Sequence, residues 1–188
     1  LGGGGGDTFF GGSGSDTLTG NGGVDGLSGD AGDDILVAED TDASIDGGSG
    51  ADTAWFGASV SSSNLTDAKL TAIEVVEITN AAAGSYNFSA QSEGLTINGG
   101  SGADTITGGS GNDLITGGTG EDKLAGGLGD DTLVATDSDA RIDGGAGNDT
   151  VRFAASVSSS ELEDSKLTGV ETVEITKTAA GDRIGRNA

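Results

Sequence analysis

Large apolar residues recur once every nine positions along most of this sequence, and glycines and polar residues fill the spaces between them. One apolar residue in nine is too sparse for a self-supporting amphipathic helix or hairpin. The period suits a coil in which each turn lays a short strand beside an earlier one. Positions seven to nine of each block are then the strand, with position eight pointing inward. The expected inward residues are Phe9, Leu18, Leu27, Leu36, Ile45, Ala54, Phe88, Ile97, Ile106, Ile115, Leu124, Leu133, Ile142 and Val151.

The nine-residue blocks form two sets without gaps, one with blocks beginning at residues 2 to 47 and one with blocks beginning at residues 81 to 144. The best copies, such as GGSGSDTLT (11–19) and GGSGNDLIT (108–116), follow the pattern G-G-x-G-x-D-x-U-x, where U is a large apolar residue. Positions one to six are expected to form the turn between strands. Glycine permits the positive φ angles that such a turn requires.

A longer period of 97 residues is superimposed on the shorter one. The sequence GDDILVAEDTDASIDGG (32–48) returns as GDDTLVATDSDARIDGG (129–145), and eight blocks plus a 25-residue insert account for the period. The chain begins in mid-pattern, which predicts that it is a piece of a longer protein. The expected segments are a block set (1–55), an insert continuing the coil (56–80), degenerate blocks (81–98), a second block set (99–152), a second insert (153–177) and a tail or the start of a further copy (178–188).

The composition favours a structure that binds cations and argues against several other functions. Asp and Glu number 31 against 8 Lys and Arg, so the formal net charge is -23. This charge disfavours nucleic acid and anionic membrane surfaces as direct partners. No apolar run is long enough to insert into a membrane. His and Cys are absent and there is no G-x-S-x-G sequence, so we expect no enzymatic activity.

The nine-residue blocks resemble the RTX, or hemolysin-type, calcium-binding repeat, closely over 2–55 and 99–152 and more loosely over 81–98. The resemblance implies an all-β fold, a right-handed parallel β-roll or β-helix solenoid, with calcium held between its turns. The longer module, with AIEVVEIT (72–79) and GVETVEIT (169–176), is similar to the repeats of bacterial surface-layer proteins and large secreted adhesins.

Position six of the regular blocks is aspartate, and this is the expected calcium ligand. Calcium takes about six to eight oxygen ligands, and glycine-rich turns leave backbone carbonyls uncrowded. In a coil with two strands per turn, alternate blocks stack on one side. Each ion would then bridge two stacked carboxylates, for about eight ions in all, unless these are only solvated turn residues. The expected columns are Asp7 and Asp25; Asp16, Asp34 and Asp52; Asp104 and Asp122; and Asp113, Asp131 and Asp149.

Two blocks, 38–46 and 135–143, lose their glycines and carry alanine at position six. Both retain a D-x-D sequence, Asp40 with Asp42 and Asp137 with Asp139. We interpret these four residues as calcium ligands that end a column by supplying side-chain oxygens in place of carbonyls. The alternative is a degraded turn without a role.

The inserts are expected to have two parts. SVSSSNLTDAKL (59–70) and SVSSSELEDSKL (156–167) predict a loop with one helical turn, and IEVVEIT (73–79) and VETVEIT (170–176) predict a strand that continues the stack. Val37 and Val134 are apolar at outward positions. Either the insert covers them or they are singly exposed. Trp55 should also point outward, either to pack against the insert or to bind a partner.

These observations favour a calcium-stapled structural segment of a secreted bacterial surface protein, such as a surface layer or adhesin, located outside the cell or at its surface. Folding would follow export, when calcium binds. A folding and secretion module of a secreted enzyme or toxin is the alternative, and a carbohydrate-binding module using Trp55 is a third. Calcium ions are the expected partners, and copies of the chain itself or cell-surface glycans remain open.

Overall fold

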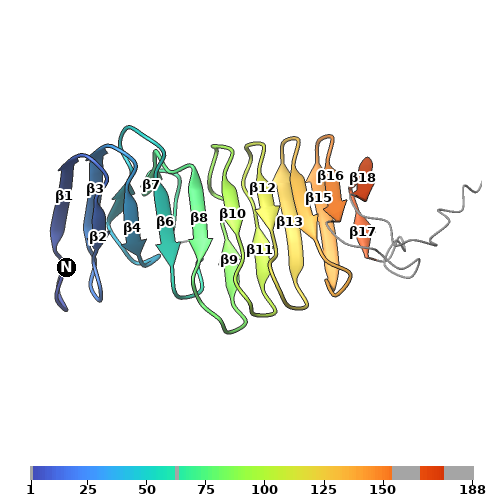
Figure 1. Cartoon of the computed structure of the whole chain (residues 1–188), viewed down its shortest axis with the longest axis horizontal. Helices are drawn as coiled ribbons and strands as arrows, with labels where there is room; N and C mark the ends of the chain where they lie inside the picture. The colour runs from blue at the N-terminus through green and yellow to red at the C-terminus, as the bar shows by residue number, and fades with distance from the viewer. Residues whose placement is uncertain (1, 62–63, 154–165, 176–188) are drawn as a thin grey trace, which may run out of the picture.

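The computed structural model describes residues 2–61, 64–153 and 166–175, and it is a parallel β-solenoid (Figure 1). Strands are the only regular elements in this part of the chain, which confirms the expected all-β fold. No helix that could cross a membrane occurs in it. The strands are β1 (Thr8–Ser13), β2 (Thr17–Thr19), β3 (Gly26–Ala31), β4 (Ile35–Ala38), β5 (Ser44–Asp46), β6 (Thr53–Phe56), β7 (Leu70–Thr71), β8 (Val75–Ile78), β9 (Ser85–Asn87), β10 (Thr96–Asn98), β11 (Thr105–Thr107), β12 (Leu114–Thr116), β13 (Lys123–Leu128), β14 (Thr132–Ala135), β15 (Arg141–Ala146), β16 (Thr150–Phe153), β17 (Leu167–Thr168) and β18 (Thr172–Ile175).

Alternate strands lie in opposite layers of the solenoid. The even-numbered strands form one nine-stranded sheet, and the odd-numbered strands form a four-stranded sheet (β1–β3–β5–β7) and a five-stranded sheet (β9–β11–β13–β15–β17). All pairs are parallel, and within a block set each residue pairs with the one 18 positions later, as in Leu18 with Leu36. Two blocks therefore make one turn, as the nine-residue period predicts.

The core is one continuous cluster of apolar side chains enclosed between the two layers. Position eight is buried in every regular block after the first, with Leu36, Ile45, Ile97, Ile106 and Ile115 fully inaccessible. Phe9, in the first turn, is only partly buried because nothing in the structure stacks outside it. The predicted inward rank is therefore confirmed for the regular blocks. Such burial contributes roughly 1.5–3 kcal/mol for each large side chain.

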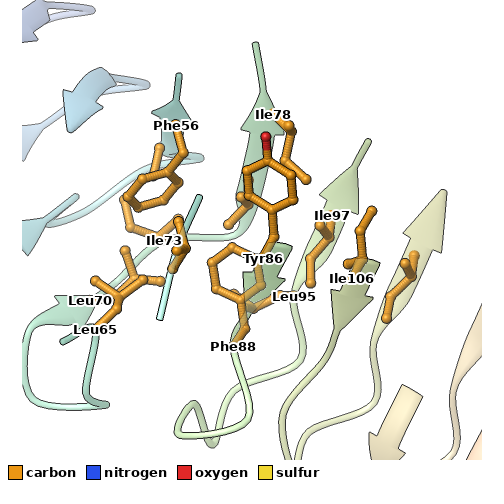
Figure 2. Close-up of a cluster of buried hydrophobic side chains, with 14 of the residues drawn as sticks. Phe56, Leu65, Leu70, Ile73, Ile78, Tyr86, Phe88, Leu95, Ile97 and Ile106 are labelled. Atoms are coloured by element: carbon orange, nitrogen blue, oxygen red, sulfur yellow. The ribbon is translucent and has the colours of Figure 1, made fainter. Parts of the chain in front are cut away.

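The expected register of the block at 81 is wrong. Its strand is Ser85–Asn87, two residues earlier than predicted, and Tyr86 rather than Phe88 pairs with Ile106. Phe88 is still buried, beyond the strand, and its ring lies 6.1 Å from that of Phe56 (Figure 2). This block has no aspartate at position six, so packing of two aromatic rings, rather than a fixed six-residue turn, sets its register.

Positive φ angles occur at positions two and four of the turns that begin at residues 11, 20, 29, 47, 117, 126 and 144, as expected, but not of those that begin at 2, 99 and 108. Gly48 and Gly50, with φ of 98° and 147°, are examples. A side chain at either position would also strike the carbonyl of the preceding stacked turn. In the regular blocks where position two is not glycine it is Asn21 or Asp30, whose φ angles are 62° and 70°. Asn and Asp tolerate this conformation better than other residues do.

Ala72 is the exception, because it has a φ of 51° and no local side-chain hydrogen bond to offset the strain. Its counterpart 97 residues later is Gly169, with a φ of 56°. We expect Ala72→Gly to stabilise the folded chain by about 1 kcal/mol, because the left-handed conformation strains alanine. Thermal unfolding in saturating calcium measures this. Ala103→Gly, where φ is not positive, should instead destabilise, and a lower melting temperature for both variants would contradict the explanation.

The first insert enters the core where the odd-numbered layer divides. Val60 forms an isolated parallel bridge with Tyr86 at the edge of β9, and Leu65 is fully buried. The side-chain amide of buried Gln91 donates to the Leu65 carbonyl at 3.0 Å. Leu65 N donates to Ser61 O and Leu70 N to Thr66 O. The described residues of this stretch contain turns but not the predicted helical turn. Most of the matching stretch of the second insert lies outside the described residues.

The predicted insert strands are confirmed as β8 and β18, whereas the short β7 and β17 were not predicted. On the outer face of the nine-stranded sheet, Val37 is flanked by Thr19 and Trp55, and Trp55 by Glu77. Trp55 therefore points outward, as expected. Val37, Trp55 and Val134 are half-buried within this face. Coverage of the two valines by the inserts stays a prediction.

Candidate calcium sites

The position-six aspartates stack in the columns that the sequence predicts. In the Asp16 column (Asp16, Asp34, Asp52), each backbone N–H donates to Oδ1 of the next aspartate, at 2.7 Å and 2.8 Å. The Asp113 column (Asp113, Asp131, Asp149) repeats this with two bonds of 2.8 Å. One carboxylate oxygen of each acceptor is thereby fixed by the backbone of the preceding turn.

The two remaining columns follow the same rule on the opposite side of the solenoid. Asp7 N donates to Asp25 Oδ1 and Asp104 N to Asp122 Oδ1, both at 2.8 Å. All but the first two aspartates, Asp7 and Asp16, are at most 2% exposed. The parallel stacking of the turns therefore places rows of carboxylates in the interior of the turns.

The second carboxylate oxygen is the unusual feature of these columns. A buried polar atom without a hydrogen bond costs roughly 1–3 kcal/mol, and more when it is charged. Eight such Oδ2 atoms occur among the described residues, four in each block set, and their regular placement favours a repeated cation-binding position over isolated defects. They belong to Asp16, Asp25, Asp34, Asp52, Asp104, Asp122, Asp131 and Asp149.

Backbone carbonyl oxygens lie near the unpartnered Oδ2 atoms. A methyl group on Gly29 would contact both Asp34 Oδ2 and the carbonyl oxygen of Gly47 in the next stacked turn. Gly126 is placed in the same way against Asp131 Oδ2 and Gly144 O. Position one is therefore glycine because two oxygens converge on its α-carbon. Carboxylate and carbonyl oxygens are the ligands that calcium prefers, so the donor set fits this ion.

Side chains alone do not form the sites. No group of three acidic side chains that could hold a metal lies within the described ranges. A bound calcium would therefore take most of its protein ligands from the backbone, as the glycine-rich turns suggest. The role of each aspartate as a ligand remains a proposal.

Burial raises the pKa of several column carboxylates. It raises the pKa of Asp131 to about 7 and that of Asp122 to about 6, and backbone hydrogen bonds offset only part of this effect. The neighbouring charges of Asp113 and Asp149 raise the pKa of Asp131 further. The pKa of Asp52 is also raised, by burial first and then by Asp34 and Glu74. A divalent cation between the turns would favour the charged forms instead.

These raised pKa values predict that protonation of the buried carboxylates at low pH stabilises the calcium-free roll, as bound calcium would at neutral pH. The unfolded chain titrates near its ordinary value of 3.8, so between about pH 4 and pH 7 the folded chain binds protons that the unfolded chain releases. Stability of the calcium-free roll should therefore fall as pH rises through this range, by about 4 kcal/mol for Asp131 alone. We expect more strand in the circular dichroism spectrum at pH 4.5 than at pH 8 in chelator. Concentrated sodium chloride at pH 8 controls for general screening, and a signal that is flat or rises with pH would contradict the assignment.

The D-x-D residues divide into two roles. Asp42 continues the Asp7 column, because its Oδ1 accepts from Asp25 N at 3.1 Å, while its Oδ2 accepts from Glu39 N at 2.8 Å. Asp139 likewise accepts from Asp122 N and Thr136 N. The hydrogen-bonded columns end at these residues, and protein N–H groups donate to both oxygens of each carboxylate. Their role as calcium ligands stays a prediction.

Asp40 lies off the column. Its Oδ2 accepts from Ser61 N at 3.0 Å and from the Asn64 side chain at 3.2 Å, so it ties the insert to the terminal turn. Asp137 is exposed, and the matching residues of the second insert lie outside the described part of the chain. The structure therefore does not bring Asp40 together with Asp42 in one set of ligands.

Sequence reasoning missed two glutamates at the ends of the other columns. Asp52 N donates to Glu74 Oε2 at 2.8 Å, and Asp149 N to Glu171 Oε2 at 2.7 Å. The signal was present, because both glutamates occur in the insert strand sequence and recur 97 residues apart. From the sequence alone, these segments predict a strand and do not indicate that their glutamates lie at the column ends.

Position five carries a second ladder on the exposed side of the turns. Ala51 N donates to Asp33 Oδ1 at 2.9 Å, and Asn148 N to Asp130 Oδ1 at 2.8 Å. In this ladder a backbone N–H of the later turn donates to a carboxylate of the earlier turn. In the position-six ladder the N–H of the earlier turn donates to the carboxylate of the later one. The position-five side chains hold the turns together without being buried.

The comparisons with known proteins agree with this geometry. The model of the RTX calcium-binding nonapeptide repeat, which spans four copies, matches residues 1–36, 98–133 and 125–155, together half of the chain. No curated protein shows a significant match.

Proposed function

The chain belongs to the RTX calcium-binding nonapeptide repeat family, and on that premise we propose that it is a calcium-stapled structural segment of a secreted bacterial surface protein, such as a surface layer or adhesin. Repeats of this family bind calcium, and the all-strand solenoid is a structural calcium-binding region. The observation that carries the proposal is the set of eight buried Oδ2 atoms without a partner.

Folding and calcium binding are coupled through these carboxylates. In the extended chain they are hydrated and repel one another, with a net charge of -23 that favours expansion. The roll stacks them in rows and removes water from their second oxygens, which is unfavourable without a counter-charge. The chain therefore stays extended where calcium is scarce, which suits export, and folds in the calcium-rich exterior.

Tandem repetition supports a surface role over attachment to an enzyme or toxin. The turns, the inserts and the column ends all recur at 97 residues, as expected of a protein that extends by adding modules. The reading frame that contains this chain separates the alternatives. Further copies of the module would support the surface protein, and an adjoining catalytic domain would support the alternative.

A calcium titration of chelator-treated protein tests the proposal. We expect circular dichroism to report a transition from an extended chain to strand, with a midpoint between the micromolar calcium of a cell interior and the millimolar calcium outside. Strand that is already complete in chelator and insensitive to calcium would overturn both the mechanism and the proposed setting.

A further inference from the structure

The inserts replace the six-residue calcium turn with a turn of three residues. Residues 47–52 connect β5 to β6, whereas only residues 72–74 connect β7 to β8. The flanking registers continue without a shift, since Asp46 pairs with Thr71 and Thr53 with Val75. The shortened turn therefore stacks directly on the last regular turn of the Asp16 column.

The position-one carbonyl and the position-six carboxylate of a regular turn both have counterparts in the short turn. A methyl group on Gly47 would contact Asp52 Oδ2 and the Ala72 carbonyl, just as one on Gly29 would contact Asp34 Oδ2 and the Gly47 carbonyl. Glu74 takes the place of the next aspartate, because its Oε2 accepts the Asp52 N–H at 2.8 Å. Glutamate is one methylene longer than aspartate, and this extra reach suits the shorter turn.

The second module repeats the arrangement independently. A methyl group on Gly144 would contact Asp149 Oδ2 and the carbonyl of Gly169, and Glu171 Oε2 accepts the Asp149 N–H at 2.7 Å. Both modules therefore place a carboxylate, a carbonyl and a glutamate together at the end of the column.

The buried carboxylate oxygens at these ends support a cation-binding role. Asp52 and Asp149 are fully inaccessible, and Oδ2 of each has no hydrogen-bond partner. We propose that each insert completes a terminal calcium site, formed by Asp52, the Ala72 carbonyl and Glu74 in the first module and by Asp149, the Gly169 carbonyl and Glu171 in the second. This inference rests on the proposed calcium-dependent function. In the added sites, the ligands on one side of the ion come from an insert instead of a nine-residue block.

The terminal site also ends the column. The turn 72–74 is three residues shorter than a regular turn, so it lacks the position-two and position-four carbonyls that a regular turn would offer to a further ion. In the next stacked turn Leu95 stands at position six, and its N–H donates to Asp113 Oδ1 at 2.7 Å, which starts the following column. Glu74 is exposed, so water completes the coordination of the terminal ion. The site should therefore bind more weakly than those between two regular turns.

Calorimetric calcium titration of Glu74→Gln, Glu171→Gln and the double variant tests the inference. Glutamine keeps an oxygen that accepts the aspartate N–H but loses the charge, so the roll should persist in circular dichroism. We expect about one ion fewer in each single variant and about two fewer in the double variant. Glu77→Gln and Glu174→Gln are matched controls three residues along the same segments. There the native carboxylates accept from Asn98 Nδ2 and Arg152 Nε on the outer face, and calcium stoichiometry should be unchanged.

Unchanged stoichiometry and affinity in all three test variants would overturn the inference and leave the glutamates as hydrogen-bond caps. Equal losses in the controls would also overturn it, since the effect would then be one of general charge. The two modules give independent measurements if one variant does not fold. A parent chain that binds no calcium would contradict the proposed function itself, which distinguishes the two failures.

Discussion

Removal of calcium at neutral pH is expected to convert the roll into an extended chain. A ligand that binds only the folded state stabilises it by about 2.7 kcal/mol per site at a hundredfold excess over its dissociation constant. Eight such sites would contribute on the order of 20 kcal/mol, which exceeds the usual 5–15 kcal/mol of total stability. The same ions would carry about +16 of charge to set against the carboxylates.

Circular dichroism and hydrodynamic radius, measured before and after chelation, check this expectation. Magnesium is the matched control, because its smaller and stricter octahedral shell suits these carbonyl-rich sites poorly. Concentrated sodium chloride controls for screening. Full recovery of the roll with either substitute would contradict the requirement for calcium coordination.

Among Asp→Asn substitutions in the second block set, Asp131→Asn should weaken calcium-dependent folding most. Asp131 is the middle residue of its column: its Oδ1 accepts from Asp113 N, its own backbone N–H donates to Asp149 Oδ1, and its buried Oδ2 has no partner. The amide keeps an acceptor for Asp113 N–H but leaves a neutral group beside two proposed ions. We expect the calcium midpoint to rise more than tenfold, a cost above about 1.4 kcal/mol, and the melting temperature at fixed calcium to fall.

Asp130→Asn is the control one residue away. Asp130 is exposed, and its Oδ1 accepts from Asn148 N, a bond that asparagine can also accept. Its calcium midpoint should stay within about twofold of the parent. A similar midpoint for the two variants would show that total charge, rather than the buried column, controls folding.

Much of the fold could be predicted from the nine-residue period. Leu18, Leu27 and Leu36 recur at position eight, and nine residues with one apolar side chain permit little besides stacked strands. The aspartate columns followed by geometry, since stacking of alternate blocks places Asp16 beside Asp34. Where the period weakened, prediction was less accurate, and Tyr86 took the place expected for Phe88.

The candidate site was predicted only in part, because ligands from different segments meet through tertiary contacts. Asp40 and Asp42 are two residues apart, yet one anchors the insert through Ser61 and the other ends a column. Glu74 lies 22 residues from Asp52 in the chain and next to it in the fold. No local spacing rule relates either pair.

The sequence by itself determined a parallel solenoid with two blocks per turn, its inward rank and its rows of aspartate. A period of nine with glycine and aspartate at set positions specifies a local turn, and repetition propagates that turn. The sequence also indicated that two of these rows end at the D-x-D blocks, and only the tertiary structure decided how the other two rows end. The inserts have no repeat within a module, so packing on the last regular turn places Glu74 and Glu171 at the ends of the Asp16 and Asp113 columns.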